Sequence, residues 1–390
     1  MFRIYQKIEH LTIYPIHETM ESTLAQKMGL ANMGNTCFLN VVLQSLRLTP
    51  PLGTLFLKNA IKIRKKSKKT ELVEAFQTLF TDFWKNHPSN GNTPVMTPRG
   101  FYRSFLNVLQ ENEDTWYSQG HQCCAGEAVQ YMLDSLHDGM YKKVTMDISG
   151  CPSSREESSH MKALQSWSTF FTKEYSPIVE HFYGQTQISV QCNSCNNISE
   201  RYEPWIVKEL SIPGGDVVGG TVPTMEECLK HNFSSEILDD YQCDNCKTRG
   251  KATKTDRISR LPPITILHLK RFTNSQQKVC GKVTWDLDSL DFSSVMAFRR
   301  DPFLDCHRVS GYETYAVIEH LGSFHGGHYA MFGKQCGTWY EYDDSSVMEV
   351  APDRVVSANS YILFLMRTNM ADDMRKSFAK QIQELRSDSR

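Results

Sequence analysis

Apolar residues recur at helical spacing through the first third of the chain. Residues 38–48 (FLNVVLQSLRL) are apolar nearly all round and contain no Ala, Gly or Pro. They predict a buried helix of about three turns, which Pro50-Pro51 closes. Leu and Phe recur every three or four residues across Glu71–Trp84, and Val, Met and Leu do so across 125–137. These two periods predict two further helices with one buried face each.

The period changes to two after a polar stretch at 149–160. Six segments from about residue 180 onward alternate or are rich in β-branched and aromatic residues: QTQISVQC, ISERYEPWIVKELSI, ITILHLKRF, YETYAVIEHL, HYAMFG and SYILFLMR. They predict β-strands. Helices first and strands later favour an α+β fold, in which a helical lobe faces a sheet lobe. A cleft between two such lobes is a usual place for an active site.

The composition narrows the class of protein. Of 390 residues, 40% are hydrophobic and 11% aromatic, which excludes wholesale disorder. Lys and Arg number 43 against 44 acidic residues, so no net field attracts nucleic acid or an anionic membrane, and the basic run at 64–69 is expected to be a solvated loop. The N-terminus has no signal-like apolar region, and no apolar run approaches ~18 residues. We expect a protein of the cytosol or nucleus that binds neither membrane nor nucleic acid.

Cys37 is the first candidate for chemistry. It directly precedes the predicted buried helix, where the positive end of the helix dipole favours a thiolate and is expected to lower the thiol pKa. The preceding loop, GLANMGNT, is rich in Gly and Asn and can present backbone N–H groups and side-chain amides to an oxyanion. The alternative is a structural cysteine at the start of a core helix.

A histidine and two aspartates far downstream can complete the chemistry. His328 follows Gly326-Gly327 and begins the predicted strand HYAMF, beside an open loop. Asp343-Asp344 follow the aromatic run WYEY, at the end of a neighbouring strand within reach of an imidazole. A nucleophilic thiol needs a proton acceptor, and that acceptor needs a third group to fix its tautomer. His325 and most other histidines are interpreted as structural.

Two CxxC pairs predict a metal site. Cys192 and Cys195 lie between two predicted strands, and Cys243 and Cys246 form the second pair. Four thiolates suit a closed, structural Zn²⁺ site without an open ligand position. Redox-active or incidental cysteines are the alternative. The remaining cysteines show no ligand pattern, and the CxxC spacing in a chain of this size favours reduced thiols over disulfides.

Taken together, these motifs resemble the ubiquitin-specific protease family of papain-like cysteine peptidases. The similar elements run from GLANMGNTCFLNVVLQSL through FYGQ (182–185), the CxxC pairs, RLPPITILHLKRF and GGHY to WYEYDDSSV and SYILFLMR. The resemblance covers roughly residues 29–366. It implies a hand-like fold with a helical thumb (about 29–165), zinc-tipped β fingers (about 185–260) and a sheet palm. Residues 1–28 are then an N-terminal extension, and 367–390 a charged tail that forms a surface helix or a frayed end.

The resemblance also implies roles for single residues. Cys37 matches the family's nucleophile, His328 its general base and Asp343 the third member of the triad. Asn32 stands where the family places the amide of its oxyanion hole, and Asp344 could share the orienting role of Asp343. The implied activity is a thiol isopeptidase that cuts after the C-terminal glycine of ubiquitin. Its implied partners are ubiquitin and ubiquitinated proteins, and we expect a monomer.

One stretch departs from the family pattern. Where the family commonly shows Gln-Gln-Asp-Ala-x-Glu, this chain has Gln122-Cys123-Cys124-Ala125-Gly126-Glu127. The missing carboxylate at Cys124 should weaken binding of a basic ubiquitin tail by about 1–3 kcal/mol if the pair is desolvated. Either another acid such as Glu127 receives the tail, or the preferred substrate carries another ubiquitin-like modifier. A third hypothesis is a catalytically silent scaffold that binds ubiquitin.

Overall fold

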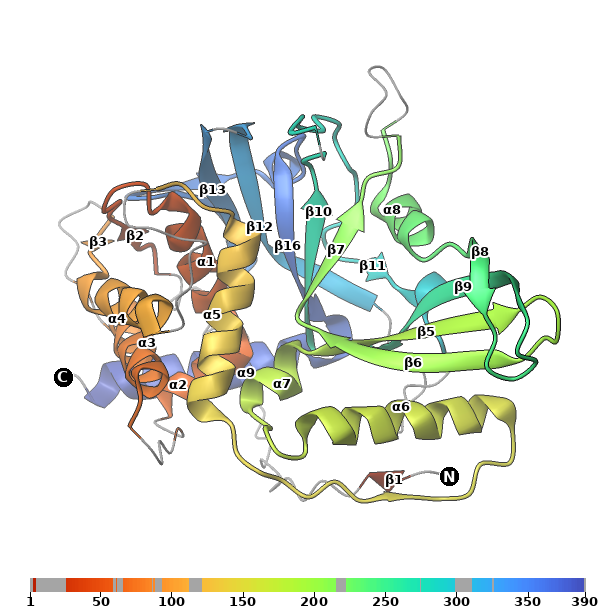
Figure 1. Ribbon diagram of the computed structural model, residues 1–390. Helices are drawn as coiled ribbons and strands as arrows, with labels where there is room; N and C mark the ends of the chain where they lie inside the picture. The colour runs from red at the N-terminus through yellow and green to blue at the C-terminus, as the bar shows by residue number, and fades with distance from the viewer. Residues whose placement is uncertain are drawn as a thin grey trace.

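The computed structural model describes residues 3–4, 26–58, 61, 66–85, 87, 93–111, 121–214, 222–273, 275–298, 311–324 and 326–388. Most of the expected N-terminal extension, together with His325, lies outside these residues. The described part combines a helical lobe with a large sheet, and a narrow second sheet projects from it (Figure 1). This arrangement confirms the predicted α+β fold.

The helical lobe contains the three predicted helices and two others. The predicted ones are α1 (Cys37–Arg47), α3 (Lys68–Trp84) and α5 (Ala125–Met140). Every residue of α1 is buried, as the all-round apolar pattern indicates. α2 (Pro50–Leu57) was not expected, because the two prolines were interpreted as a stop. They instead occupy the first turn of the next helix, where a missing N–H costs nothing.

Four more helices precede the last strands of the chain. α4 (Arg99–Glu111) completes the helical lobe, and α7 (Pro177–Phe182) leads into the projecting sheet. α6 (Arg155–Phe171) begins inside the polar stretch that we interpreted as a divider, and Ser154 caps it by accepting from Glu157 N. α8 (Met225–Asn232) starts with a capping box between Thr224 and Glu227.

The large sheet, here called the palm sheet, has the order β15-β14-β13-β12-β16-β10-β7, with β11 paired to β12. All pairs are antiparallel except β10 with β7. Its strands are β7 (Val207–Ser211), β10 (Ile264–Lys270), β11 (Leu290–Asp291), β12 (Gly311–Ser323), β13 (Gly326–Gln335), β14 (Thr338–Asp343), β15 (Ser346–Val350) and β16 (Ser360–Arg367).

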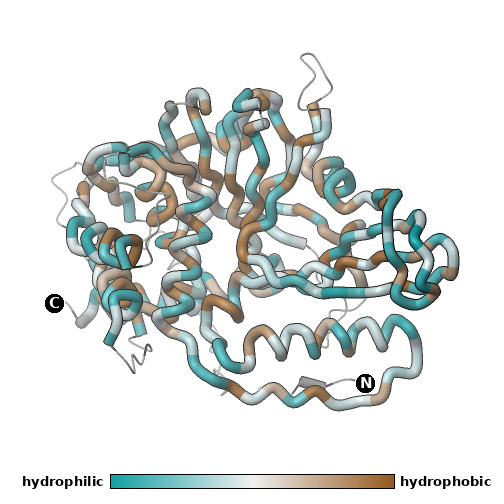
Figure 2. Tube along the Cα trace, in the orientation of Figure 1, coloured by the Kyte–Doolittle hydropathy of each residue, from teal (hydrophilic) through white to brown (hydrophobic). Residues whose placement is uncertain are grey.

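Both faces of the palm sheet are buried at its centre. Along β16, Ile362 and Phe364 belong to the core shared with α1 and α5, whereas Leu363 and Leu365 belong to a second core that includes α8. In Figure 2, hydrophobic segments lie at the centre of the molecule, where this sheet is buried on both faces. This double burial explains why the β16 sequence, SYILFLMR, is apolar throughout instead of alternating with polar residues.

The projecting sheet, here called the finger sheet, has the order β6-β5-β9-β8. Its strands are β5 (Gly184–Cys192), β6 (Ile198–Trp205), β8 (Glu236–Gln242) and β9 (Arg249–Arg260). The segment ISERYEPWIVKELSI was expected to be one strand. It breaks at Ile206, so that β6 stays in the finger sheet while β7 joins the palm sheet.

The smaller elements are β1 (Arg3–Ile4) with β4 (Ile148–Ser149), β2 (Gly29–Leu30) with β3 (Val95–Met96), and the 3₁₀ turns η3 (Ser293–Val295) and η4 (Pro352–Arg354).

The tail after β16 forms a long helix, α9 (Thr368–Asp388). It lies across the helical lobe and buries its apolar side, including Phe378 and Ile382. Phe378 packs edge-on against Trp84, with ring centroids 5.0 Å apart, and fills the space beside Gly53 of α2. The tail is therefore a packed surface helix and not a frayed end. Among the described residues, no helix is long and apolar enough to cross a membrane.

Candidate active site

The loop before α1 is fastened to the turn between β14 and β15. Leu30 N donates to Asp344 O over 2.8 Å, and a Cβ on Gly29 would lie 2.3 Å from Ser345 O, so only glycine fits this approach. Gly34 (φ 101°) and Asn35 (φ 53°) then turn the chain into α1 through the left-handed region. The loop therefore places the start of α1 against the palm sheet.

Cys37, the first residue of α1, is buried, with 4% of its surface exposed. α1 packs against β13, and the backbone of Tyr329 forms a hydrogen bond with the Cys37 sulfur. His328 directly precedes Tyr329 on that strand. The structure thus brings residue 37 to the strand that carries the predicted base, across 290 residues of sequence.

The expected fall in the pKa of Cys37 is wrong for this structure. Burial raises the pKa of the Cys37 thiol, and the nearby negative charge of Asp344 raises it further. Hydrogen bonds from the backbones of Tyr329, Phe38 and Cys37 itself lower the pKa, but they do not outweigh the burial. The prediction considered only the helix dipole, which lowers a thiol pKa, and left out the desolvation of the sulfur, which raises it.

His328 lies at the start of β13 and contacts Asp343 at the end of β14. Its Nε2 lies 2.5 Å from Asp343 Oδ1, shorter than the about 2.7–2.9 Å typical of a hydrogen bond between an imidazole and a carboxylate. Both side chains keep access to solvent, since 37% of His328 and 50% of Asp343 is exposed. The imidazole therefore has a fixed partner on one nitrogen, and its other nitrogen is left for proton transfer.

Asp344 has different partners from Asp343. Its Oδ2 accepts from Asn32 Nδ2 over 2.9 Å, and its Oδ1 accepts from Asn40 Nδ2 over 2.7 Å. The residue is in the left-handed region (φ 47°), so its side chain leaves the strand in another direction. The sequence left the two aspartates interchangeable, whereas the geometry gives Asp343 to His328 and Asp344 to Asn32.

Asn32 is held at both ends of its amide. Its Oδ1 accepts from Gly34 N over 2.9 Å and from Thr36 N over 3.2 Å, while its Nδ2 donates to Asp344. The amide is thereby oriented beside the start of α1. A side-chain amide carries two N–H groups, so one remains for a substrate oxygen.

Sequence reasoning missed two polar residues at this site. Asn40 is buried within the apolar helix α1, three residues after Cys37, and its polar character at a core position was the available signal. Gln122 bonds to both peptide groups of Gly327, and its match to the first Gln of the family's Gln-Gln-Asp-Ala-x-Glu pattern was the available signal.

Cys124 lies at the N-cap of α5, on the thumb side of the site. Its Sγ is 3.2 Å from the hydroxyl of Tyr361, and it is half-buried. Its neighbour Cys123 is also half-buried, and desolvation raises the pKa of Cys123 to about 11. Glu127 is exposed on the first turn of the same helix. The position where the family carries a carboxylate is therefore occupied by a cysteine whose sulfur is hydrogen-bonded to a phenol.

The four predicted metal ligands come together at the tip of the finger sheet. Cys192 Sγ lies 3.8 Å from Cys246 Sγ, and Cys195 Sγ lies 3.7 Å from Cys243 Sγ. The two CxxC turns have the same backbone form, because Asn196 N donates to Cys192 O, Lys247 N donates to Cys243 O, and both donors have φ near 57°. The four thiols form a group that could hold a metal ion.

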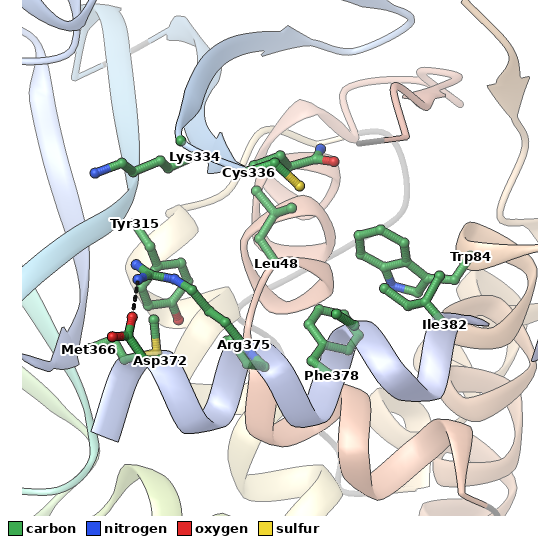
Figure 3. Close-up of a pocket in the computed structure, with 14 residues that line it drawn as sticks. Leu48, Trp84, Tyr315, Lys334, Cys336, Met366, Asp372, Arg375, Phe378 and Ile382 are labelled. Carbon is green, nitrogen blue, oxygen red and sulfur yellow. Dashed lines mark ion pairs between the residues drawn. The ribbon is translucent and has the colours of Figure 1, made fainter. Parts of the chain in front are cut away.

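A cavity of about 300 Å³ lies at the opposite end of β13 from His328 (Figure 3). Trp84, Tyr315 and Phe378 line its apolar part. Its two cations are already paired, Lys334 with Asp288 and Arg375 with Glu313. The cavity therefore offers no unpaired charge to a ligand, and neither Cys37, His328 nor Asp343 lines it.

Comparisons with known proteins identify the family and similar folds. A sequence model described as ubiquitin carboxyl-terminal hydrolase matches residues 28–365. Ubiquitin carboxyl-terminal hydrolase 2 of Homo sapiens is 30% identical over 370 residues, which are 90% of this chain and 57% of that protein. Ubiquitin carboxyl-terminal hydrolase Usp2 of Drosophila melanogaster is 30% identical over 350 residues, which are 87% of this chain and 35% of that protein. The chain thus spans about a third to three-fifths of these relatives.

Among solved structures, the Ubp8/Sgf11/Sus1/Sgf73 DUB module of SAGA bound to ubiquitin aldehyde has a similar fold. The TM-score is 0.65 at 20% identity, over 91% of this chain and 72% of the other. The same module bound to monoubiquitin gives a TM-score of 0.64 at 21% identity. The family match spans the helical lobe, the finger sheet and the palm sheet, and the chain belongs to the ubiquitin carboxyl-terminal hydrolase family.

Proposed function

We propose that this chain is a cysteine-type deubiquitinase that hydrolyses the bond after the C-terminal glycine of ubiquitin. The observation that carries the proposal is Cys37 at the start of α1, against the strand whose first residues include His328, with His328 bonded to Asp343. The names of the relatives, which are ubiquitin carboxyl-terminal hydrolases, supply the substrate class. Ubiquitinated proteins are then the partners.

In this proposal Cys37 attacks the glycine carbonyl after His328 accepts its proton. The burial that raises the pKa of Cys37 keeps the thiol protonated at rest, so that a base is needed at the moment of attack. Asp343 stabilises the imidazolium that forms.

The free N–H of Asn32 and the backbone N–H of Cys37 receive the oxyanion. As the tetrahedral adduct collapses to a thioester, the C–N bond breaks and His328 gives its proton to the leaving lysine amine. The same imidazole then takes a proton from water, and the resulting hydroxide hydrolyses the thioester and frees the Cys37 thiol.

Replacing the sulfur tests this function. Cys37→Ala should abolish hydrolysis of ubiquitin that carries a C-terminal fluorophore and should leave the far-UV circular dichroism spectrum unchanged. Cys280→Ser, at an exposed cysteine, is the matched control and should keep full activity. Normal turnover by Cys37→Ala would disprove the assignment.

We further propose that the four-cysteine group holds a structural Zn²⁺. A tetrahedron with Zn–S bonds of about 2.3 Å has sulfur–sulfur edges of about 3.8 Å, and two of the sulfur pairs lie 3.7 and 3.8 Å apart. With all four positions taken by cysteine, the ion would serve folding of the finger tip and not the reaction. Cys195→Ser should remove about one equivalent of zinc by elemental analysis, and Cys280→Ser should remove none.

Cys124 supports a second candidate substrate. Because the thiol cannot pair with a basic tail as a carboxylate would, the chain could favour another ubiquitin-like modifier. A panel of ubiquitin and its relatives, each with a C-terminal fluorophore, separates the hypotheses. Preference for a relative supports the second candidate, and no hydrolysis of any of them supports a silent scaffold.

We also propose that the protein works in the cytosol or nucleus. The proposed nucleophile and the proposed zinc ligands are all thiols that must stay reduced, and these compartments keep thiols reduced.

A further inference from the structure

The strand that carries His328 has an open edge where it begins. β13 pairs with β12 from Gly326 onward, with Gly322 opposite Gly327 and Leu321 opposite His328. On its other side, pairing with β14 starts only at Met331, opposite Tyr342. Within the described chain, residues 326–330 therefore have no neighbouring strand on that side.

Gln122 takes the place of the missing strand at Gly327. Its Oε1 accepts from Gly327 N over 3.1 Å, and its Nε2 donates to Gly327 O over 2.9 Å. One acceptor and one donor facing the N–H and C=O of a single residue reproduce a rung of an antiparallel ladder. The loop before α5 thus supplies one rung to β13, directly before His328.

The same open edge of β13 also meets Cys37. Successive residues of a strand alternate in direction, so Gly327 and Tyr329 point their N–H groups to the same side. The Gly327 N–H goes to Gln122, and the Tyr329 backbone goes to the Cys37 sulfur. His328 lies between these two contacts. The position of the imidazole relative to the sulfur therefore depends on both.

Gly326 and Gly327 would leave the start of β13 flexible without the hydrogen bonds from Gln122. A Cβ on Gly327 would lie 2.4 Å from Leu321 O and 2.5 Å from His320 Nε2, so a larger residue cannot stiffen this position. Glycine samples more backbone conformations than any other residue. The two hydrogen bonds from the Gln122 side chain restrict the backbone of Gly327, which leads into His328. They link the loop before α5 to the palm sheet.

We propose that Gln122 is a positioning residue for the reaction, which holds the Gly327 peptide so that His328 keeps its place beside Cys37. The inference rests on the proposed function for its substrate, but the juxtaposition of the two hydrogen bonds, the open edge and the glycine pair is independent of it. Because the described contacts of Gln122 are with the backbone of Gly327, it acts on the reaction through the placement of His328, and its loss should change turnover more than binding.

The first test is steady-state kinetics with fluorophore-linked ubiquitin. Gln122→Ala should lower kcat by about 10- to 10²-fold and change KM less than about threefold. Gln122→Met keeps the length of the side chain without the amide and should be as slow as Gln122→Ala. Gln130→Ala is the matched control, because Gln130 is an exposed residue of α5 bonded to Asp134, and it should keep the wild-type kcat. An unchanged kcat in Gln122→Ala would overturn the proposal.

The second test needs no ubiquitin. The rate at which iodoacetamide alkylates Cys37 near neutral pH is followed by mass spectrometry. The His328→Ala variant gives the reference rate for a protein that lacks the base. Gln122→Ala should slow alkylation toward that rate, and hydrogen exchange in the peptide that contains Gly327 should become faster. If the wild-type protein cleaves no ubiquitin, the proposed function fails, while these two readouts still judge the role of Gln122. Wild-type alkylation and exchange in Gln122→Ala would refute it.

Discussion

Asp343 and Asp344 offer the sharpest functional comparison, because they are adjacent in sequence and differ in partner. Asp343→Asn removes the charge that faces the imidazolium, and Asp344→Asn leaves one oxygen where two amides need an acceptor. The first change should act through His328. The second should act mainly through Asn32, while loss of the Asp344 charge removes one cause of the raised pKa of Cys37.

The size of each effect follows from exposure and partners. Two unit charges at 4 Å interact with about 1 kcal/mol in water and about 4 kcal/mol at an effective dielectric of 20, which is about fivefold to about 10³-fold in rate. Since 37% of His328 and 50% of Asp343 is exposed, we expect Asp343→Asn to lower kcat by about 10- to 10²-fold. This is less than the ~10⁴-fold known for a buried triad aspartate. Asp344→Asn should cost about tenfold, as one charge-assisted bond to an amide is lost.

A double-mutant cycle separates the two routes. Both substitutions are combined with Asn32→Ala, and kcat is measured with fluorophore-linked ubiquitin. Asp344→Asn should add little in the Asn32→Ala background, whereas Asp343→Asn should keep its full effect. The reasoning is refuted if the cost of Asp344→Asn persists without Asn32 and the cost of Asp343→Asn disappears.

Three further predictions follow from the same geometry. Asn32→Ala should lower kcat by about 10²-fold with little change in KM, and a change confined to KM would argue against an oxyanion role. Because burial raises the pKa of Cys37, its alkylation in the free enzyme should still rise with pH above the ~8.5 of a free thiol, and a plateau beginning at neutral pH would contradict this. Gly53→Ala places a Cβ 2.0 Å from the ring of Phe378, so it should lower the free energy of unfolding in urea by about 1–3 kcal/mol, and Phe378→Ala in the same chain should relieve that strain. An unchanged urea midpoint would mean that α9 does not pack there.

The sequence predicted the elements whose periodicity is strong. The all-round apolar α1 and the strands β10, β12, β13 and β16 were found because burial on one or two faces leaves a regular pattern. The helix α6 was missed, because its start is polar and exposed. The break between β6 and β7 was missed as well, since two strands that enter different sheets can share one continuous pattern.

Within the site, residue types were easier to predict than pairings. Cys37, His328 and the four clustered cysteines were identified from local motifs. In the structure α1, which begins at Cys37, packs on the strand that carries His328, and the four cysteines form one group. The choice between Asp343 and Asp344 depends on a turn conformation, φ 47° at residue 344, which the sequence does not specify. The raised pKa of Cys37 depends on tertiary burial, and the Gln122 contact depends on where a strand edge is left open. Such long-range properties leave no local pattern.

The proposed activity requires that Cys37 is the nucleophile that attacks the end of a ubiquitin tail. Its direct test is reaction of the wild-type protein with ubiquitin that bears an electrophilic C-terminus, followed by peptide mapping of the adduct. We predict one covalent adduct per chain on Cys37, which is lost in Cys37→Ala and retained in Cys280→Ser. An adduct on another cysteine, or none at all with a folded protein, would contradict the account.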